Sequence, residues 1–220
     1  MTIAAILFDM DDLLINSAAI HFAANDMALA AFGKTSAEVS PHLTQKFYGM
    51  RIREIMELLI HHFQLKVGLN EFTAARNRHF MGLVAKGVGP MPGMDAILKN
   101  AKRWKMKTAL ATSGLKEYAD VILKQFQLEN YFDTIVTGSD VKNPKPAPDV
   151  FLSAAKKLGL EPRECLVLED STHGITAAKR AGMKAIGVEN SMMPAFQDLS
   201  MADAVVTRLD KITLELIQKL

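Results

Sequence analysis

Short apolar runs recur along the chain, and polar residues or turns end each of them. They cover residues 4–8, 108–111, 135–136, 166–168, 185–188 and 204–206. Segments 115–126, 148–158 and 174–181 separate several of these runs and have apolar positions at helical spacing. Buried parallel strands joined by amphipathic helices are typical of this alternation. The pattern predicts an α/β fold, with a doubly wound, mostly parallel, Rossmann-like sheet.

One long segment interrupts the alternation. Between residues 17 and 87 there is no strand-like run, and apolar positions follow helical spacing in 18–32, 52–63 and 71–84, with Gly33, Gly49 and Gly68 between or beside these helices. The stretch 87–93 holds three Gly and two Pro, as a linker does. We therefore expect an α/β core of residues 1–16 and 88–220, with a helical cap domain of residues 17–87 inserted at the carboxyl edge of the sheet.

Composition excludes several classes of protein. The 220 residues include 26 basic and 24 acidic side chains, a net charge of +2, which argues against a nucleic-acid partner. The single Cys excludes an intrachain disulfide. Because no apolar run reaches about 18 residues and the N-terminal run is too short for a signal peptide, we expect no membrane partner. A cytoplasmic monomer is the expectation.

Acidic residues follow two of the predicted strands. Asp9, Asp11 and Asp12 follow the first, and Glu169 and Asp170 follow a later one. Parallel strands place such residues at one edge of the sheet, where the carboxylates repel one another unless a cation joins them. Oxygen ligands suit Mg²⁺. Turns after strands are often rich in Asp for structural reasons alone, but two such clusters favour a metal site.

Two further segments carry candidate chemistry. Thr112, Ser113 and Gly114 lie between a predicted strand and a helix, where hydroxyl and backbone N–H groups can cradle a phosphate. A simple helix cap is the alternative for these residues. Lys145 lies in a loop stiffened by Pro144, Pro146 and Pro148, so its side chain has a restricted direction. It can neutralise charge in phosphoryl transfer, or it can be an ordinary solvated lysine.

In this order, the four segments resemble the motifs of the haloacid dehalogenase superfamily, in its β-phosphoglucomutase-like and sugar-phosphate phosphatase branch. The resemblance implies that Asp9 is the nucleophile, which forms an aspartyl-phosphate, and that Asp11 is the general acid and then the base. It also implies that Thr112 binds the transferring phosphoryl group and that Lys145 offsets its charge. The helical insert is similar to the cap of this superfamily.

The resemblance further implies a Mg²⁺ site and substrate contacts. The metal ligands would be Asp9, Glu169, Asp170 and the backbone carbonyl of Asp11. Ser113 and Gly114 would complete the phosphate cradle. In the cap, His21 and Arg51 are candidate substrate-binding residues, with an exposed helix-surface position as the alternative for each.

Two positions depart from the pattern of the superfamily. Asp12 replaces a usual Gly, and Asn16 replaces a usual Asp. Asp tolerates left-handed backbone better than most residues, so we expect the turn to be retained. The extra charge of Asp12 would raise the pKa of Asp11 if the two face one another, or Asp12 would only complete the turn. Asn16 is expected to be structural.

The leading hypothesis is a Mg²⁺-dependent phosphatase of small phosphorylated metabolites, with sugar phosphates first. A hexose-phosphate mutase is the alternative within enzymes, and hydrolysis is favoured because the cap sequence contains no clear set of sugar-binding residues. A catalytically silent binding module is a third hypothesis, which only Asp12 and Asn16 support.

Overall fold

The chain forms two compact units in the computed structural model, which describes residues 2–47, 50–190 and 197–220. One unit consists of Met1–Asn16 and Gly89–Leu220, and the other of Ser17–Val88. Val88 is buried and belongs to the second unit, one residue beyond the expected boundary. The helix break expected at Gly49 lies outside the described residues.

The first unit is built on a six-stranded sheet in the order β5-β4-β1-β6-β7-β8, and every neighbouring pair is parallel. All six predicted strands are confirmed. Their bounds are β1 Ala5–Phe8, β4 Lys107–Ala111, β5 Thr134–Val136, β6 Cys165–Glu169, β7 Lys184–Val188 and β8 Ala204–Val206. Residues of β1, β4 and β6 are almost all buried, as expected for central strands covered on both faces.

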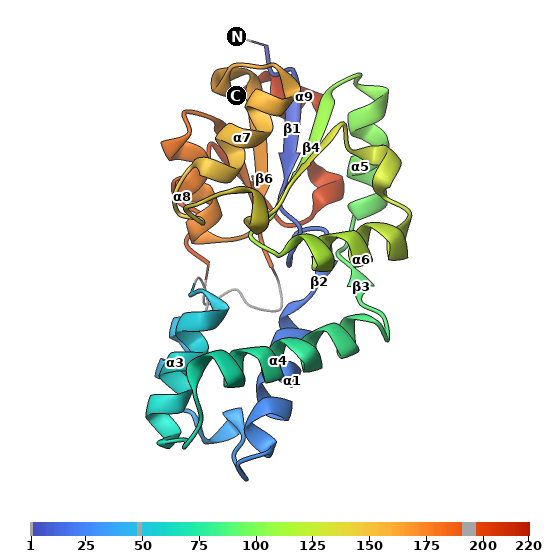
Figure 1. Cartoon of the computed structure of the whole chain (residues 1–220). Helices are drawn as coiled ribbons and strands as arrows, with labels where there is room; N and C mark the ends of the chain where they lie inside the picture. Colours follow the sequence, from blue (N-terminus) through green and yellow to red (C-terminus); the bar gives the residue numbers. More distant parts are fainter. Residues whose placement is uncertain (1, 48–49, 191–196) are drawn as a thin grey trace. The chain divides into compact units, whose positions relative to one another are not determined.

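Helices cover both faces of this sheet. Helices α7 (Asp149–Leu158) and α8 (Thr172–Arg180) share one apolar cluster with alternate residues of the strands. Figure 1 shows α5 (Met94–Arg103) and α6 (Lys116–Phe126) on the opposite side. The chain ends in α9 (Leu214–Gln218). The three predicted crossover helices are confirmed within two residues at each end. Short 3₁₀ turns lie at Ser36–Glu38, Glu129–Tyr131, Gly138–Asp140, Pro162–Glu164 and Leu209–Lys211.

Two short strands lie beside the unit boundary. β2 (Ile15–Asn16) pairs antiparallel with β3 (Gly89–Pro90), so the outgoing and returning segments of the chain are hydrogen-bonded to one another. The sequence predicted a plain linker at 87–93. The pairing was missed because two-residue strands rich in Gly and Pro carry no apolar alternation.

The second unit is helical, as its sequence pattern predicts. It contains α1 (Ala18–Ala30), α2 (Pro41–Phe47), α3 (Ile52–Phe63) and α4 (Leu69–Val84). The short helix α2 was not predicted. Residues of these helices form a separate apolar core, which includes Leu29, Met56, Leu59 and Phe72. The second unit therefore has its own hydrophobic core.

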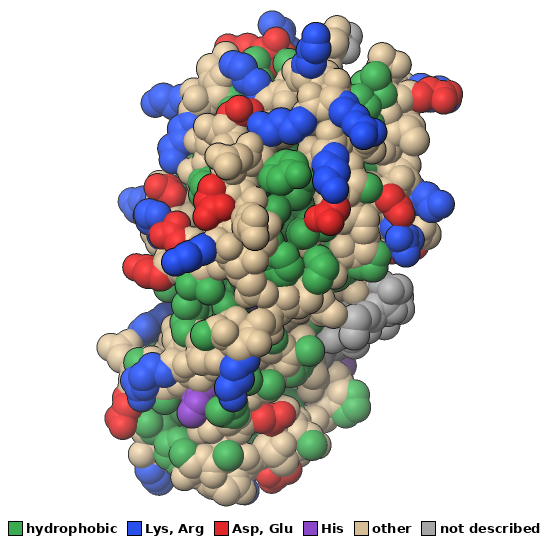
Figure 2. All heavy atoms as spheres, turned by 90° about the vertical axis from the view of Figure 1, so that its right-hand side faces the viewer, with side chains coloured by type: hydrophobic (Ala, Val, Ile, Leu, Met, Phe, Trp, Pro, Cys, Tyr) green, Lys and Arg blue, Asp and Glu red, His purple; other side chains and the backbone are tan. Residues whose placement is uncertain are grey.

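Charged side chains of both signs are interspersed over the face drawn in Figure 2, consistent with a net charge of only +2. In the described part of the chain, no helix has the length and apolar character needed to cross a bilayer.

Candidate active site

Three of the candidate segments meet at the carboxyl edge of the sheet. β1 lies between β4 and β6, with Phe8 opposite Leu110 on one side and Leu168 on the other. Asp9 follows β1, and its backbone N–H donates to the Leu168 carbonyl at 3.1 Å. Thr112 follows β4. The central strand thus places Asp9 between the other two segments, at the shared edge that the sequence predicts.

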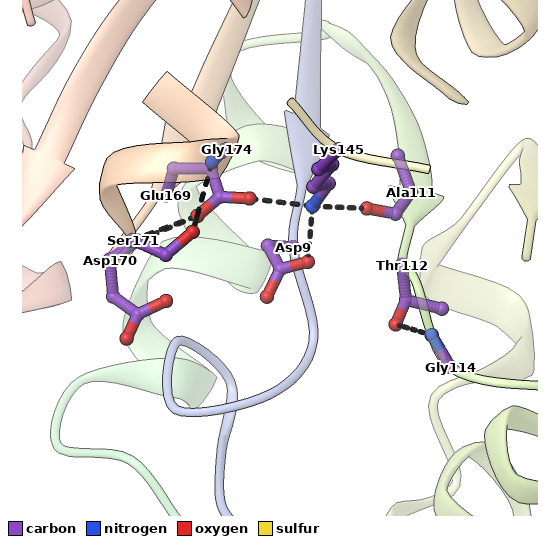
Figure 3. Close-up of polar contacts among 9 residues, drawn as sticks. All are labelled: Asp9, Ala111, Thr112, Gly114, Lys145, Glu169, Asp170, Ser171 and Gly174. Carbon is purple, nitrogen blue, oxygen red and sulfur yellow. Dashed lines mark hydrogen bonds and ion pairs between the residues drawn. The ribbon is translucent and has the colours of Figure 1, made fainter. Parts of the chain in front are cut away.

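Lys145 joins these segments from a fourth. Its Nζ donates to Asp9 Oδ1 and to Glu169 Oε1, both at 2.5 Å, and to the Ala111 carbonyl at 3.1 Å (Figure 3). The ammonium also lies 4.7 Å from the ring centre of Phe151 in α7. Only 7% of the Lys145 side chain is exposed, so the alternative of a solvated lysine is wrong.

Glu169 organises the loop that carries Asp170. While its Oε1 accepts from Lys145, its Oε2 accepts from the backbone N–H groups of Asp170 and Ser171 and from the Ser171 hydroxyl. Ser171 Oγ in turn accepts from Gly174 N–H and caps α8. Hydrogen bonds therefore engage both carboxylate oxygens of Glu169, which ties the end of β6 to the lysine.

Burial and charge shift the pKa values of this cluster. Burial raises the pKa of Asp9 well above its ordinary value, and Lys145 opposes that shift. Burial also raises the pKa of Asp170, with contributions from Glu169, Asp9 and Asp12. Burial alone lowers the pKa of Lys145, but the charges of Asp9 and Glu169 raise it above its ordinary value. One ammonium thus faces three acidic groups.

The same acidic groups fit a metal ion. One carboxylate oxygen from each of Asp9, Glu169 and Asp170 lies within 4.8 Å of the others. Among the described residues, none donates a hydrogen bond to the carboxylate of Asp170, which Figure 3 shows turned toward the same space as Asp9. Oxygen-only ligands suit a hard divalent cation, whose charge would offset the excess of carboxylates.

The Thr112 loop is held by close backbone packing. Thr112 is fully buried, and its Oγ1 accepts from Gly114 N–H at 2.9 Å. Gly138, which follows β5, donates its N–H to the Gly114 carbonyl at 2.8 Å. A Cβ at Gly138 would lie 2.3 Å from the Ser113 carbonyl oxygen, so this loop needs glycine there. Sequence reasoning missed Gly138, because only the tertiary contact reveals its role.

Asp11 has a partner that the sequence did not predict. The hydroxyl of Tyr118, in α6, donates to Asp11 Oδ1 at 2.6 Å. The two residues are far apart in the sequence, and a tyrosine on an amphipathic helix looks like an ordinary core residue.

The structure explains one of the two departures from the superfamily pattern. Asp12 adopts the expected left-handed backbone, with φ of 57°, and its N–H donates to the Ile15 carbonyl at 2.7 Å. Its charge contributes to the raised pKa of Asp170, while its effect on Asp11 stays a prediction. Asn16 lies in β2 opposite Gly89.

The remaining candidates belong to the helical unit. Nδ1 of His21 lies 2.5 Å from a guanidinium nitrogen of Arg76, and burial together with this charge lowers the pKa of His21 to about 3. Arg51 precedes α3, forms an ion pair with Glu54, and has a side chain that is 62% exposed. For both residues, substrate contact stays a prediction.

Comparison with known proteins decides the family. The family described as haloacid dehalogenase-like hydrolase matches residues 6–188. The chain belongs to this family. It is 32% identical over 189 residues to the phosphorylated carbohydrates phosphatase of Thermotoga maritima, with 86% of each protein covered. It is 29% identical over 222 residues to β-phosphoglucomutase of Bacillus subtilis, with 98% of this chain and 94% of the relative covered.

Solved structures agree with this family. A putative β-phosphoglucomutase from Thermotoga maritima matches over the full length of both chains, with a TM-score of 0.77 and 29% identity. The protein is a haloacid dehalogenase-like hydrolase, and the relatives that it is similar to include sugar-phosphate phosphatases and a β-phosphoglucomutase. The hypothesis of a silent binding module is not supported.

Proposed function

We propose that this enzyme is a Mg²⁺-dependent phosphatase that hydrolyses small phosphorylated sugars through an aspartyl-phosphate on Asp9. The observation that carries the proposal is the buried ammonium of Lys145, which contacts both Asp9 and Glu169 beside Asp170. The relatives support the substrate class, because one is named as a phosphatase of phosphorylated carbohydrates and another as a fructose-1-phosphate phosphatase.

Asp9 acts as the nucleophile in this proposal. Burial disfavours its charged form, while the ammonium of Lys145 opposes this effect and reduces the repulsion between the carboxylate and an incoming phosphate. A carboxylate oxygen of Asp9 attacks phosphorus, and the bond from phosphorus to the sugar oxygen breaks. Lys145 then faces the charge that develops on the phosphoryl group.

Asp11 transfers the protons. It gives a proton to the leaving sugar oxygen in the first step. In the second step it accepts a proton from water, whose oxygen attacks phosphorus and releases phosphate and Asp9. The Thr112 hydroxyl and the backbone N–H of Ser113 bind the phosphoryl oxygens in both steps, while the Gly114 N–H holds Thr112 in place through its hydrogen bond to Oγ1.

The residues that would hold the Mg²⁺ ion are Asp9, Asp170, Glu169 and the backbone carbonyl of Asp11. When bound, the ion would neutralise phosphate charge and orient the phosphoryl group. Because the oxygens of Glu169 already accept hydrogen bonds from Lys145 and the following loop, its larger contribution is to fix Asp170. Cytoplasmic location and a monomeric state stay predictions.

A substrate panel tests the proposal. Phosphate release from sugar phosphates, nucleotides and phosphorylated acids is measured with Mg²⁺ and again with EDTA. We expect turnover of sugar phosphates that EDTA abolishes. In Asp9→Asn, turnover should fall by several orders of magnitude, because the acid-stable, hydroxylamine-sensitive phosphoenzyme can no longer form.

Asp120→Asn provides the matched control. Asp120 is an exposed residue of α6 that pairs with Lys116, so the same chemical change should leave turnover unchanged. Substantial activity in a folded Asp9→Asn protein would refute the nucleophile, and activity that survives EDTA would refute the metal requirement.

A mutase is the second candidate, because a β-phosphoglucomutase is 29% identical across almost the whole chain. The same phosphoenzyme would then return its phosphoryl group to a second hydroxyl of a sugar. Incubation with β-glucose 1-phosphate separates the two activities, since hydrolysis yields phosphate and glucose whereas a mutase yields glucose 6-phosphate.

A further inference from the structure

Tyr118 reaches the proposed acid–base residue from a different element. Its hydroxyl donates to Asp11 Oδ1 at 2.6 Å, and only 5% of the residue is exposed. The contact links the first turn of α6 to the loop after β1, within one unit of the structure. The steps described above assign no role to this phenol.

Packing determines where the ring of Tyr118 lies. Gly114 precedes Tyr118 by four residues, and a Cβ at Gly114 would lie 3.0 Å from Tyr118 Cδ1 and 3.4 Å from Met10 Cε. The missing side chain at 114 therefore leaves room for the ring against the Thr112 loop. Because the ring is confined in this way, its hydroxyl has a defined position beside Asp11.

We propose that Tyr118 is a positioning residue, which holds one oxygen of Asp11 so that the carboxylate presents its second oxygen in a fixed orientation toward the reacting atoms. The inference rests on the proposed function, since it assumes that Asp11 moves protons. The proton on the second oxygen passes to the sugar oxygen as that oxygen leaves phosphorus. A proton from water returns there during hydrolysis, while the phenol keeps its own proton throughout.

A phenol is suited to this task. Its hydroxyl carries one proton that it can donate to a carboxylate oxygen, as it does to Asp11 Oδ1. The rate of a proton transfer falls steeply when the donor is misplaced, since a displacement of about 1 Å can lower the rate roughly 100-fold. Loss of the phenol should therefore affect steps that need the proton and spare steps that do not.

Substrates with different leaving groups distinguish the steps that need the proton from those that do not. A 4-nitrophenolate leaves without a proton, whereas a sugar or alkyl alkoxide requires one. For an enzyme that forms a phosphoenzyme, kcat/KM reports the steps up to its formation. Tyr118→Phe removes the hydroxyl and keeps the ring against Gly114. We expect its kcat/KM for alkyl and sugar phosphates to fall about 10- to 100-fold, with a change of less than about 3-fold for 4-nitrophenyl phosphate.

Tyr131→Phe is the matched control. Tyr131 precedes β5 at the opposite edge of the sheet, so the same loss of a hydroxyl should leave both substrates unaffected. Asp11→Asn should show the same dependence on the leaving group, and adding Tyr118→Phe to it should cause little further loss. Circular dichroism and thermal unfolding check that each variant is folded.

Three outcomes would overturn the inference. An equal fall in kcat/KM for every leaving group would indicate a purely structural role. An unchanged kcat/KM for all substrates would show that the phenol has no role in the reaction. Faster turnover would mean that the phenol holds Asp11 away from the substrate. The proposed function fails separately, if the unaltered enzyme releases no phosphate from any substrate.

Discussion

At the scale of single residues, the position of the Glu169 side chain depends on the absence of a side chain at Gly174. The carboxylate of Glu169 lies against the first turn of α8, where a Cβ at Gly174 would be only 1.8 Å from it. Because the same carboxylate holds Lys145 and the loop of Asp170, the absence of a side chain at 174 is a condition for the whole acidic cluster.

Gly174→Ala should therefore destabilise the α/β unit by about 3 kcal/mol and abolish turnover, since the methyl group displaces Glu169. Chemical denaturation and phosphate release measure the two effects. Gly82→Ala is the matched control, because Gly82 lies exposed in α4 with no atom near the added Cβ. That change should raise stability by up to about 1 kcal/mol. Similar effects of the two substitutions would contradict the packing argument.

Asp12 acts on the metal site through its charge. Its left-handed backbone fits Asp or Gly, and its carboxylate contributes to the raised pKa of Asp170. Removing that charge should lower the pKa of Asp170. The carboxylate of Asp170 would then be ionised, and so able to bind a cation, at a more acidic pH.

Calorimetric titration with Mg²⁺ across pH checks this expectation. In both Asp12→Asn and Asp12→Gly, the acid-side midpoint of binding should move to lower pH, while the free energy of unfolding changes by less than about 1 kcal/mol. An unmoved midpoint in both variants would leave Asp12 as a turn residue only.

At the scale of elements, α1 and α4 bury the charged guanidinium of Arg76 between them. Arg76 of α4 is 1% exposed, donates to Asn25 of α1 at 3.0 Å, and lies 4.7 Å from the ring centre of Phe80. His21 accepts from the same guanidinium only when its Nδ1 is unprotonated. This one hydrogen bond between the two helices therefore requires neutral His21.

Acid should destabilise this unit. The pKa of His21 is lowered to about 3 in the folded state, against 6.5 in the unfolded chain, so the unfolded state binds more protons between these values. The contribution of His21 is fully present above pH 6.5 and is lost as the pH falls toward 3. In His21→Gln, the slope of unfolding free energy against pH should be shallower by up to about 1.4 kcal/mol per pH unit in that window. The same change at exposed His61 should leave the slope unaltered.

At the scale of the whole molecule, each of the two units has apolar core residues of its own among those that the structure describes. The acidic cluster belongs entirely to the α/β unit. A ligand that binds only this unit when it is folded stabilises this unit alone.

Differential scanning calorimetry should therefore resolve two transitions, of which Mg²⁺ raises only one. At a free Mg²⁺ concentration 100 times the Kd, the gain is about 2.7 kcal/mol, or roughly 5–10 °C for a unit of this size. Asp170→Asn should remove the shift and leave the other transition in place. A shift of both transitions, or a shift that persists in the variant, would contradict the assignment of the metal to this unit.

The pattern of apolar runs was sufficient to predict the fold and the segments that carry most of the candidate site residues. Six strands and their crossover helices could be predicted because buried parallel strands require uninterrupted apolar runs. Asp9, Thr112 and Glu169 could be proposed because parallel strands end at one edge of a sheet, and Lys145 because prolines stiffen its loop. Local signals of this kind are present in the residues themselves. Short elements without periodicity, such as α2 and β2, carry no such signal.

Which side chains touch one another could be learned only from the folded chain. That Lys145 contacts Glu169 as well as Asp9, and that Tyr118 donates to Asp11, depends on contacts between residues far apart in the sequence. The role of Gly174 is likewise a matter of tertiary contact, because the Glu169 carboxylate occupies the space that a side chain at 174 would take. Such contacts follow from close packing in three dimensions, where the volume of one residue fixes the position of another, and no periodicity along the chain encodes them.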